Sequence, residues 1–206
     1  MTVVATSLWL GLIKAKECEN IDLSNMRYPI TGGEKILKAQ EIAINDFFKA
    51  HNMTVPLMKG YGMCELGGSA TVSSFKHSKL NGVGYPIKGV TVSAFDVDTN
   101  EEMKYGERGE IRVDSPACMK GYFKNDEATN EYFYKDSNGT VWGCTGDVGY
   151  VDEDGEVFIL GRATDCYYTN DGKRVFQFDI EEVILQDDSV SDCKVVQTAD
   201  ETMVVA

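Results

Sequence analysis

The stretch from Trp142 to Asp165 constrains the fold of this chain more than any other, and it reads WGCTGDVGYVDEDGEVFILGRATD. Its middle predicts a β-hairpin, because Asp152–Gly155 is a run of turn-forming residues that precedes the apolar segment Val157–Leu160. At one end Asp147 follows a glycine, beside which a ligand can approach the backbone closely, and at the other end Arg162 follows a strand. A carboxylate accepts hydrogen bonds from vicinal hydroxyls and a guanidinium binds ribose or phosphate oxygens. The two ends of the hairpin are therefore candidates for gripping a nucleotide sugar.

The charge balance excludes one large class of function. The chain has 206 residues and 43% hydrophobic content, which is enough for a core. Its 33 acidic residues outnumber its 20 lysines and arginines, and the net charge is -13. A nucleic-acid surface needs a basic footprint, so we expect no nucleic-acid partner. An anionic substrate such as ATP then requires a local positive or magnesium-bearing site.

Cysteine usage indicates the redox compartment. The six cysteines are widely spaced and contain no C-x-x-C pair, which fits reduced, buried thiols in the cytoplasm better than a disulfide framework or a zinc site. With two histidines, His51 and His77, a histidine-rich metal site is also disfavoured. The apolar run Val3–Ile13 lacks the basic flank and cleavage site of a signal peptide and is too short to span a membrane. It therefore predicts a buried helix.

The first part of the chain predicts an α/β arrangement. Residues 3–18 are expected to form a core helix, and a short strand leads to Ile30. The turn Thr31–Glu34 then opens a helix from Lys35 to about Ala50, and a strand follows at Val55–Lys59. The residues expected to form the inward stripe of the second helix are Ile36, Leu37, Ile42, Ala43, Phe47 and Phe48.

From Val83 onward, short glycine-punctuated strands predict a small antiparallel β subdomain. Its expected elements are strands at Val90–Val97 and Gly109–Val113, a helix at Asn125–Phe133 and the hairpin described above. Two acidic strings, Asp96–Asn100 and Asp152–Gly155, imitate the start of a calcium loop. Because neither continues with the glycine and distal glutamate that such a loop requires, we expect both to be turns.

After the hairpin we expect the beginning of an α+β domain, with a helix at Phe178–Gln186 and strands at Cys193–Val196 and Met203–Ala206. The predicted fold class is therefore α/β plus β. A partial α/β sheet layer is followed by a small antiparallel β subdomain and by the beginning of an α+β C-terminal domain. The corresponding predicted domains are residues 1–80, 81–162 and 163–206.

The motifs around the hairpin form part of a longer series. Residues 142–147 read W-x-x-T-G-D, the hairpin ends in G-R-x-x-D, and Gly172 and Ile180–Val183 follow. Further segments agree in order and spacing, namely Ile30–Glu34, Tyr61–Glu65, Gly106–Ile111 and Met119–Phe123. Together they resemble the AMP-forming acyl-CoA synthetases of the adenylate-forming superfamily, which also contains luciferases and carrier-protein adenylation domains. The resemblance implies a fragment that covers the end of the large domain and the start of the mobile C-terminal domain.

The resemblance implies an ATP-dependent acid–CoA ligase. In that family a carboxylic acid attacks the α-phosphate of ATP to give an acyl-adenylate and pyrophosphate, and the acyl group then passes to CoA. The implied cofactors are ATP or AMP, Mg²⁺ and CoA, the implied partner is a small carboxylic acid, and no membrane span is expected. Two alternatives to this interpretation remain open. In the first, the acyl acceptor is a carrier-protein pantetheine instead of CoA. In the second, the chain is a non-catalytic relic that binds a nucleotide or a partner protein.

The same resemblance assigns roles residue by residue. It places the turn of Gly32 to Glu34 against adenine, Tyr61 in a stack with adenine, and the backbone after Tyr61 toward the phosphates. It also gives Glu65 to magnesium, Asp147 to the ribose hydroxyls and Arg162 to ribose and phosphate. The implied catalytic residues are Glu65 and Arg162, and the implied nucleotide- and cofactor-binding residues are Gly32, Gly33, Glu34, Tyr61, Gly62, Met63, Cys64, Asp147, Ile159, Arg162 and Arg174.

The sequence departs from the family's pattern at two positions. Cys64 stands where threonine is usual, and a thiol is a weaker hydrogen-bonding group than a hydroxyl, which weakens the case for a phosphate contact there. Thr164 stands at the expected hinge between the domains, where aspartate or lysine is common. The loop between Asp165 and Gly172 is also one residue longer than usual, and Arg174 follows it as a candidate contact for phosphate or CoA.

Other parts of the family's machinery would lie outside this sequence. The Ser/Thr/Gly-rich phosphate loop and the distal lysine that stabilises developing charge are both absent. Removing one such charge donor costs about a hundredfold to a thousandfold in rate. We therefore expect this chain alone to have little or no ligase activity and to be a fragment of a longer enzyme. The identity of the acid is not encoded here beyond the stretch Gly67–Ser74 as candidate pocket lining.

Overall fold

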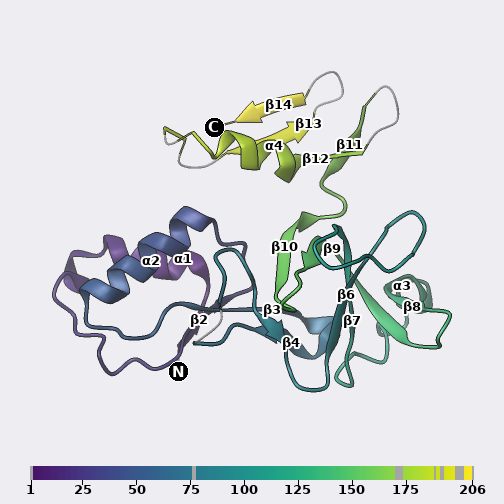
Figure 1. The fold of residues 1–206 in the computed structure, drawn as a ribbon, viewed down its shortest axis with the longest axis horizontal. Helices are drawn as coiled ribbons and strands as arrows, with labels where there is room; N and C mark the ends of the chain where they lie inside the picture. The colour runs from purple at the N-terminus through teal and green to yellow at the C-terminus, as the bar shows by residue number, and fades with distance from the viewer. Residues whose placement is uncertain are drawn as a thin grey trace. The chain divides into compact units, whose positions relative to one another are not determined.

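The structure is a computed structural model that describes residues 2–75, 78–169, 174–187, 189–190, 193–197 and 202–205 (Figure 1). The chain divides into two compact units. The first comprises Met1–Thr145 and Gly149–Ile159, and the second comprises Gly146–Val148 and Leu160–Ala206. The fold class is the predicted one, α/β plus β followed by a small α+β part. The predicted domain boundaries after residues 80 and 162 remain a prediction.

The first sheet of the first unit is the α/β layer. Its strands, in spatial order, are β1 (Thr2–Val4), β2 (Pro29–Gly32), β3 (Met58–Met63), β4 (Gly68–Val72) and β5 (Tyr85–Pro86). The pairs β1–β2 and β2–β3 are parallel, whereas β4 pairs antiparallel with both β3 and β5. Parallel neighbours need crossover connections, and helices α1 (Thr6–Lys14) and α2 (Lys38–Ala50) supply them, with the short 3-10 helix η1 (Lys16–Cys18) after α1.

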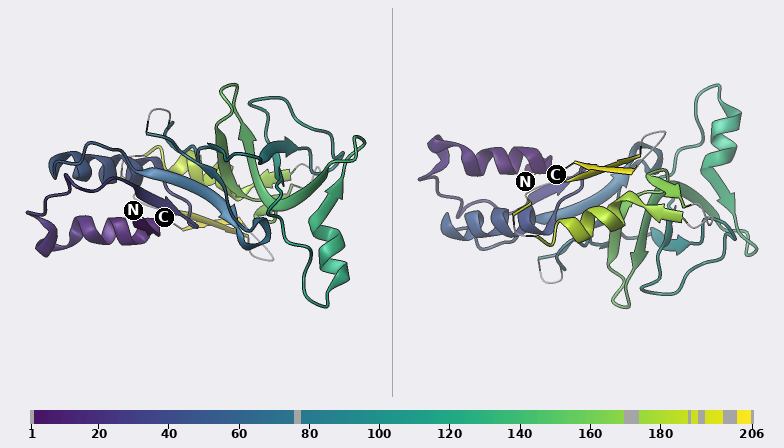
Figure 2. Two further views of the ribbon diagram at one scale, coloured as in Figure 1. Left: turned by 90° about the horizontal axis from the view of Figure 1, so that it is seen from below. Right: turned by 90° about the horizontal axis from the view of Figure 1, so that it is seen from above.

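Helices α1 and α2 pack against each other, as the two views of Figure 2 also show. Their shared core contains Trp9 and Phe48, whose rings meet edge to face with centroids 5.1 Å apart. The buried members of this cluster are Trp9, Ile36, Ile44, Phe48, Met53 and Leu57.

The prediction for the first helix was wrong at its beginning. Residues Val3 and Val4 belong to strand β1, in register with Ile30 and Thr31 of β2, and the helix begins at Thr6. An apolar, β-branched pair fits a strand as well as a helix, and the partner strand lies far away in the sequence. Residues Lys16–Cys18 form η1 instead of continuing the helix.

The predicted phase of the second helix was also partly wrong. The helix begins at Lys38, after Leu37 in an extended conformation whose backbone N–H donates to Gln40 Oε1 (3.0 Å). This start leaves Ile42 on the outer face, 42% exposed, and buries Ile44 completely. Ala43 is also exposed, whereas the predicted core residues Ile36 and Phe48 are buried, and Leu37 and Phe47 are half-buried.

The second sheet is the predicted antiparallel β part. Its spatial order is β10 (Val157–Arg162), β9 (Val141–Val151), β7 (Gly109–Asp114) and β6 (Thr91–Phe95), with β8 (Phe133–Lys135) pairing β9. Helix α3 (Asp126–Tyr132) is capped at its amino end by Asn125, whose side chain accepts from the Ala128 N–H (3.1 Å). The buried members of the core cluster that involves this sheet are Leu66, Ala70, Val92, Ala94, Ile111, Val113, Val151 and Val157.

Both acidic strings are turns, as predicted. Asp96 Oδ1 accepts from the N–H groups of Asp98 (2.9 Å) and Thr99 (2.7 Å), which is an Asx turn. In the hairpin between β9 and β10, Asp152 N–H donates to Glu156 O (3.0 Å), and Gly155 has a φ of 84°. The strands expected at Val90–Val97 and Gly109–Val113 are β6 and β7. By contrast, the strand expected at Val55–Lys59 lies later, as β3, and includes Tyr61–Met63.

The described residues of the second unit form two antiparallel strand pairs and a helix. Strand β11 (Cys166–Tyr168) pairs antiparallel with β12 (Arg174–Phe176), and β13 (Lys194–Gln197) pairs antiparallel with β14 (Thr202–Val205). Helix α4 is Gln177–Ile184, close to the predicted range. The predicted motif residue Gly172 lies outside the described residues. Among the helices that the structure describes, none has the length and apolar content required to cross a membrane.

All six cysteines are thiols, but the expectation that they are buried was wrong for most of them. Cys193 is buried, whereas Cys64 is exposed and the remaining thiols are half-buried. Cys64 follows the last residue of β3 and is the exposed first residue of the short 3-10 helix η2 (Cys64–Leu66), whose last residue is buried.

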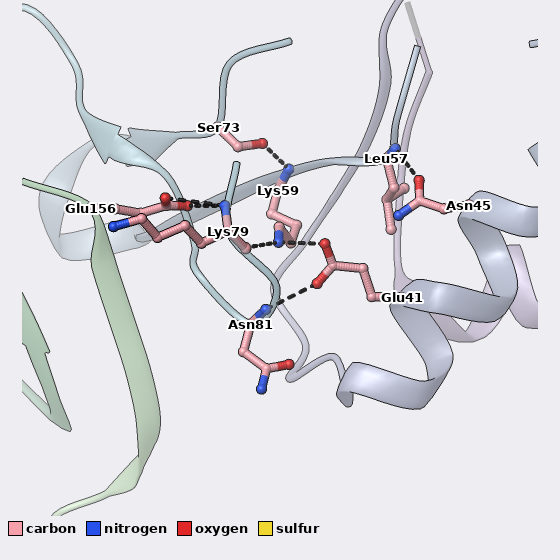
Figure 3. A network of polar contacts seen from close by, with 8 residues as sticks. All are labelled: Glu41, Asn45, Leu57, Lys59, Ser73, Lys79, Asn81 and Glu156. Carbon is pink, nitrogen blue, oxygen red and sulfur yellow. Dashed lines mark hydrogen bonds and ion pairs between the residues drawn. The ribbon is translucent and has the colours of Figure 1, made fainter. Parts of the chain in front are cut away.

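A buried polar network in the first unit joins elements that are far apart in the sequence (Figure 3). Lys59 Nζ donates to Glu41 Oε1 (2.6 Å), and the two side chains are 2% and 4% exposed. The same ammonium donates to Lys79 O (2.7 Å), and the second oxygen of Glu41 accepts from Asn81 N–H (3.1 Å). Lys79 N–H in turn donates to the fully buried carboxylate of Glu156 (3.1 and 3.2 Å). The network therefore ties α2 and β3 to the hairpin.

The side chain of Lys79 is the counter-charge for two carboxylates in the turn of that hairpin. Its ammonium donates to Asp152 Oδ2 (2.6 Å) and also contacts the carboxylate of Asp154. The hydrogen bonds to these two carboxylates raise the pKa of Lys79 above its usual value.

We expect the substitution Lys59→Met to lower the free energy of unfolding by about 3–5 kcal/mol, because it leaves the buried carboxylate of Glu41 without its counter-charge. The double variant Lys59→Met, Glu41→Leu should be less destabilised, since no buried charge then remains. Urea unfolding followed by circular dichroism measures both effects. The matched control is Lys49→Met, which breaks the exposed Lys49–Asp46 pair and should change stability by less than about 0.5 kcal/mol. An equal loss in Lys59→Met and in the control would contradict the prediction.

Candidate functional site

The glycine turn after β2 lies against the neighbouring strand. Gly32 is in register with Gly60 of β3, and a Cβ atom at Gly32 would lie 2.8 Å from Gly60 O. Gly33 has a φ of 79°, which favours glycine. The carboxylate of Glu34 accepts from Ser7 N–H (3.3 Å) and Ser7 Oγ (3.4 Å) at the amino end of α1, where a negative charge is stabilising. The side chain of Glu34 thus binds the amino end of α1. The candidate ligand-binding part of the turn is therefore its backbone.

The next predicted site residues lie on β3 and η2. Tyr61, Gly62 and Met63 complete β3, and their pairing with β4 shifts register between Tyr61 and Gly62. A Cβ atom at Gly62 would overlap the carbonyl oxygen of Gly68, so only glycine fits there. Tyr61 and Met63 pack against the core cluster that Ile159 of β10 also contacts. Strand pairing therefore brings the glycine turn beside the Tyr61 motif, and shared packing brings in Ile159.

Glu65 has a partner that sequence reasoning missed. The Tyr122 hydroxyl donates to Glu65 Oε1 (2.8 Å), and Met119 N–H donates to Glu65 O (2.7 Å). The hydrogen bond to Glu65 raises the pKa of the Tyr122 phenol above its usual value. The segment Met119–Phe123 stood out as a motif, but no spacing pattern connects it with a glutamate 57 positions earlier.

Asp147 and Arg162 meet in the second unit, as their places at the two ends of the hairpin predicted. Arg162 Nη1 donates to Asp147 Oδ1 (2.8 Å), and the side chains are 53% and 12% exposed. Gly146 has a φ of 69°, and a Cβ atom there would lie 3.2 Å from Arg162 Nη2. Ala163 N–H donates to Gly146 O (2.8 Å) and holds the two strands together. The result is a shielded carboxylate beside an accessible guanidinium, which together can bind vicinal hydroxyls and an anionic oxygen.

Arg174 lies on β12, in the same unit. Its Nε and Nη2 atoms donate to Tyr168 Oη (3.2 and 3.0 Å), and its guanidinium lies over the Tyr168 ring at 5.6 Å from the centroid. Tyr168 is 60% exposed, so this pair lies at the surface of the β11–β12 hairpin.

Comparison with known proteins identifies the family of this chain. The model of a family described as AMP-binding enzyme matches residues 1–123, which include the glycine turn, the Tyr61 motif and Tyr122. The chain belongs to the AMP-binding enzyme family.

Several known proteins match along nearly the whole chain. YdaB of Bacillus subtilis is 37% identical over 190 residues, covering 92% of this chain and 35% of YdaB. The 4-coumarate–CoA ligase 4 of Arabidopsis thaliana is 31% identical over 202 residues, covering 96% of this chain and 34% of that enzyme. Among solved structures, ATP-bound MatB from Rhodopseudomonas palustris superposes with a TM-score of 0.79 at 26% identity, covering 96% of this chain and 38% of MatB. The chain thus spans about a third of the length of these relatives.

The cysteines of this family member should differ strongly in reactivity. Cys64 is exposed, whereas burial raises the pKa of the Cys144 thiol to about 11. At pH 8 about one Cys144 thiol in a thousand is then ionised, and we expect Cys64 to react with iodoacetamide well before Cys144. Mass spectrometry of the labelled peptides at successive times measures this order. A Cys64→Ser variant should lose the fast phase, and labelling of Cys144 at the rate of Cys64 would be inconsistent with the structure.

Proposed function

We propose that this chain forms the nucleotide-binding part of an ATP-dependent acid–CoA ligase. The observation that carries the proposal is the Asp147–Arg162 pair, which offers an accessible cation beside a shielded carboxylate in a protein of net charge -13. The glycine turn beside Tyr61 supports it, because a flat base needs a close backbone and an aromatic face. The CoA specificity is supported by relatives named 4-coumarate–CoA ligase and 2-succinylbenzoate–CoA ligase.

In the proposed reaction, a carboxylate oxygen of the acid attacks the α-phosphorus of ATP, and the bond to the bridging oxygen of pyrophosphate breaks. The CoA thiol then attacks the acyl carbon, and AMP leaves. Asp147 accepts hydrogen bonds from the ribose hydroxyls, and Arg162 stabilises negative charge on the ribose and phosphate side. The backbone of Gly32 and Gly33 lines the adenine, Tyr61 stacks on it, and Arg174 contacts phosphate or CoA.

Glu65 is the proposed magnesium ligand. Its donor chemistry fits, because magnesium binds through one or two carboxylates together with waters and substrate phosphates. Glu65 is half-exposed in η2, directly after β3, and its Oε1 atom accepts a hydrogen bond from Tyr122. When bound, magnesium would neutralise charge on the phosphates of ATP.

The remaining parts of the proposal concern domains and location. We place the domain boundary after Arg162 and the hinge at Thr164, which lies in a turn closed by Asp165 N–H donating to Arg162 O (3.1 Å). We also place the protein in the cytoplasm, which agrees with its cysteines being thiols.

Acid-dependent exchange of radiolabelled pyrophosphate into ATP tests the proposal, using the natural-length protein that contains this chain and a panel of aliphatic and aromatic carboxylic acids. We expect at least one acid to support exchange and CoA to yield the corresponding thioester. Thioester formation on a carrier protein but not on CoA would replace the acceptor in this proposal. If none of the acids supports exchange although the protein binds ATP, the proposal is refuted in favour of a non-catalytic binding protein.

The substitution Asp147→Ala should weaken ATP binding about tenfold to a hundredfold. Losing a charged hydrogen-bond partner costs roughly 1.5–3 kcal/mol, which corresponds to that range of affinity. Isothermal titration of ATP into the natural-length protein measures the change. Glu153→Ala is the matched control, because it removes an equal charge from the exposed turn of the same hairpin. Equal ATP affinities of Asp147→Ala and the wild-type protein would remove Asp147 from the site.

A further inference from the structure

The Tyr122–Glu65 hydrogen bond joins two motifs within the first unit. The phenol oxygen and Glu65 Oε1 are 2.8 Å apart, and Tyr122 is 37% exposed. The phenol O–H donates this hydrogen bond, and the carboxyl oxygen of Glu65 accepts it. This bond, with its short donor–acceptor distance, sets the direction of the Glu65 carboxyl group.

Tyr122 is held in place by contacts with helix α3. Its backbone N–H donates to Thr129 Oγ1 (2.9 Å), and the Thr129 hydroxyl donates to Asn125 O (2.8 Å). Gly121 before it has a φ of 148°, and a Cβ atom at that position would lie 2.8 Å from Thr129 Cγ2. The Tyr122 ring also meets the buried Tyr132 ring edge to face, with centroids 6.3 Å apart. Both the backbone and the ring of Tyr122 are therefore anchored to helix α3.

The backbone of the same segment clamps the turn that carries Glu65. Met119 N–H donates to Glu65 O (2.7 Å). On the other side of the turn, Gly67 has a φ of 72°, and a Cβ atom there would lie 2.6 Å from Ala117 O. Main chain and side chain of Glu65 are thus both fixed by residues 117–122, although these residues follow it by more than fifty positions.

We propose that Tyr122 is a positioning residue for Glu65: its phenol holds the carboxylate in the orientation that binds the magnesium complex of ATP. This inference rests on the proposed function, in which Glu65 is the magnesium ligand. A free glutamate would lose side-chain freedom on binding a cation, whereas a carboxylate already ordered by a phenol loses less. Removing a group that orients a metal ligand costs about tenfold to a hundredfold in metal affinity.

The test uses Tyr122→Phe in the natural-length protein, because phenylalanine keeps the ring packing on Tyr132 and removes the donor. Calorimetric titration of ATP at a series of magnesium concentrations gives the half-enhancing concentration, which is the magnesium concentration that produces half of the full increase in ATP affinity. We expect Tyr122→Phe to raise that concentration about tenfold and to leave ATP binding without magnesium unchanged. The control Tyr105→Phe, at a residue that is 68% exposed, should change neither quantity.

Glu65→Gln tests the same bond from the other side. Its amide oxygen still accepts from Tyr122, but it lacks the charge that binds magnesium. We expect Glu65→Gln to raise the half-enhancing concentration at least as much as Tyr122→Phe, and the double variant to be no worse than Glu65→Gln alone. This lack of additivity identifies Tyr122 as acting through Glu65.

Several outcomes overturn the inference. One is a wild-type magnesium dependence in Tyr122→Phe, accompanied only by a lower melting temperature, which indicates a structural role. Additive effects in the double variant, or an unchanged magnesium dependence in Glu65→Gln, do so as well. The magnesium dependence of ATP binding is measured without an acid or CoA. Failure of the pyrophosphate exchange assay would therefore refute the proposed ligase activity while leaving this result to be judged separately.

Discussion

The buried ion pair between Lys59 and Glu41 is the interaction on which the arrangement of the first unit depends. Two charges removed from water are tolerated when each also has other partners, and here the carbonyl of Lys79 and the N–H of Asn81 supply them. The pair fixes β3 against α2 and, through Lys79 and Glu156, against the hairpin. Since Tyr61 lies two positions after Lys59, the position of the motif is set by this pair.

Local chemistry made some elements predictable from the sequence. The hairpin at Asp152–Gly155 and the helix that follows Asn125 were predictable because turn and helix-start signals act over a few residues. The pairing of Val3 with Ile30 was not, because both partners of a parallel pair must be known before either looks like a strand. The buried Lys59 carries no local signal either, since a lysine in an apolar run gives no indication of its partner.

The candidate site likewise contains one contact that the sequence predicts and one that it does not. The Asp147–Arg162 pair was predictable because a hairpin brings its two ends together, and 15 positions of sequence separate the two residues. The Tyr122–Glu65 bond spans 57 positions and two different elements, so no period or spacing encodes it. Glycines at positions 32, 62 and 146 mark the close backbone approaches around these motifs. The reason that these positions require glycine is visible in the structure alone, where a Cβ atom would approach a carbonyl oxygen or the Arg162 guanidinium.

The turn of the hairpin carries its own counterion. The sequence of Asp152–Gly155 imitates the opening of a calcium loop, yet in the structure the ammonium of Lys79 contacts the carboxylates of both Asp152 and Asp154. An external cation would have to displace a tethered one whose effective concentration is high and constant. In a chain with so large an acidic excess, this lowers the affinity of the turn for an added divalent cation. Lys79 thereby offsets part of the negative charge at the tip of the hairpin.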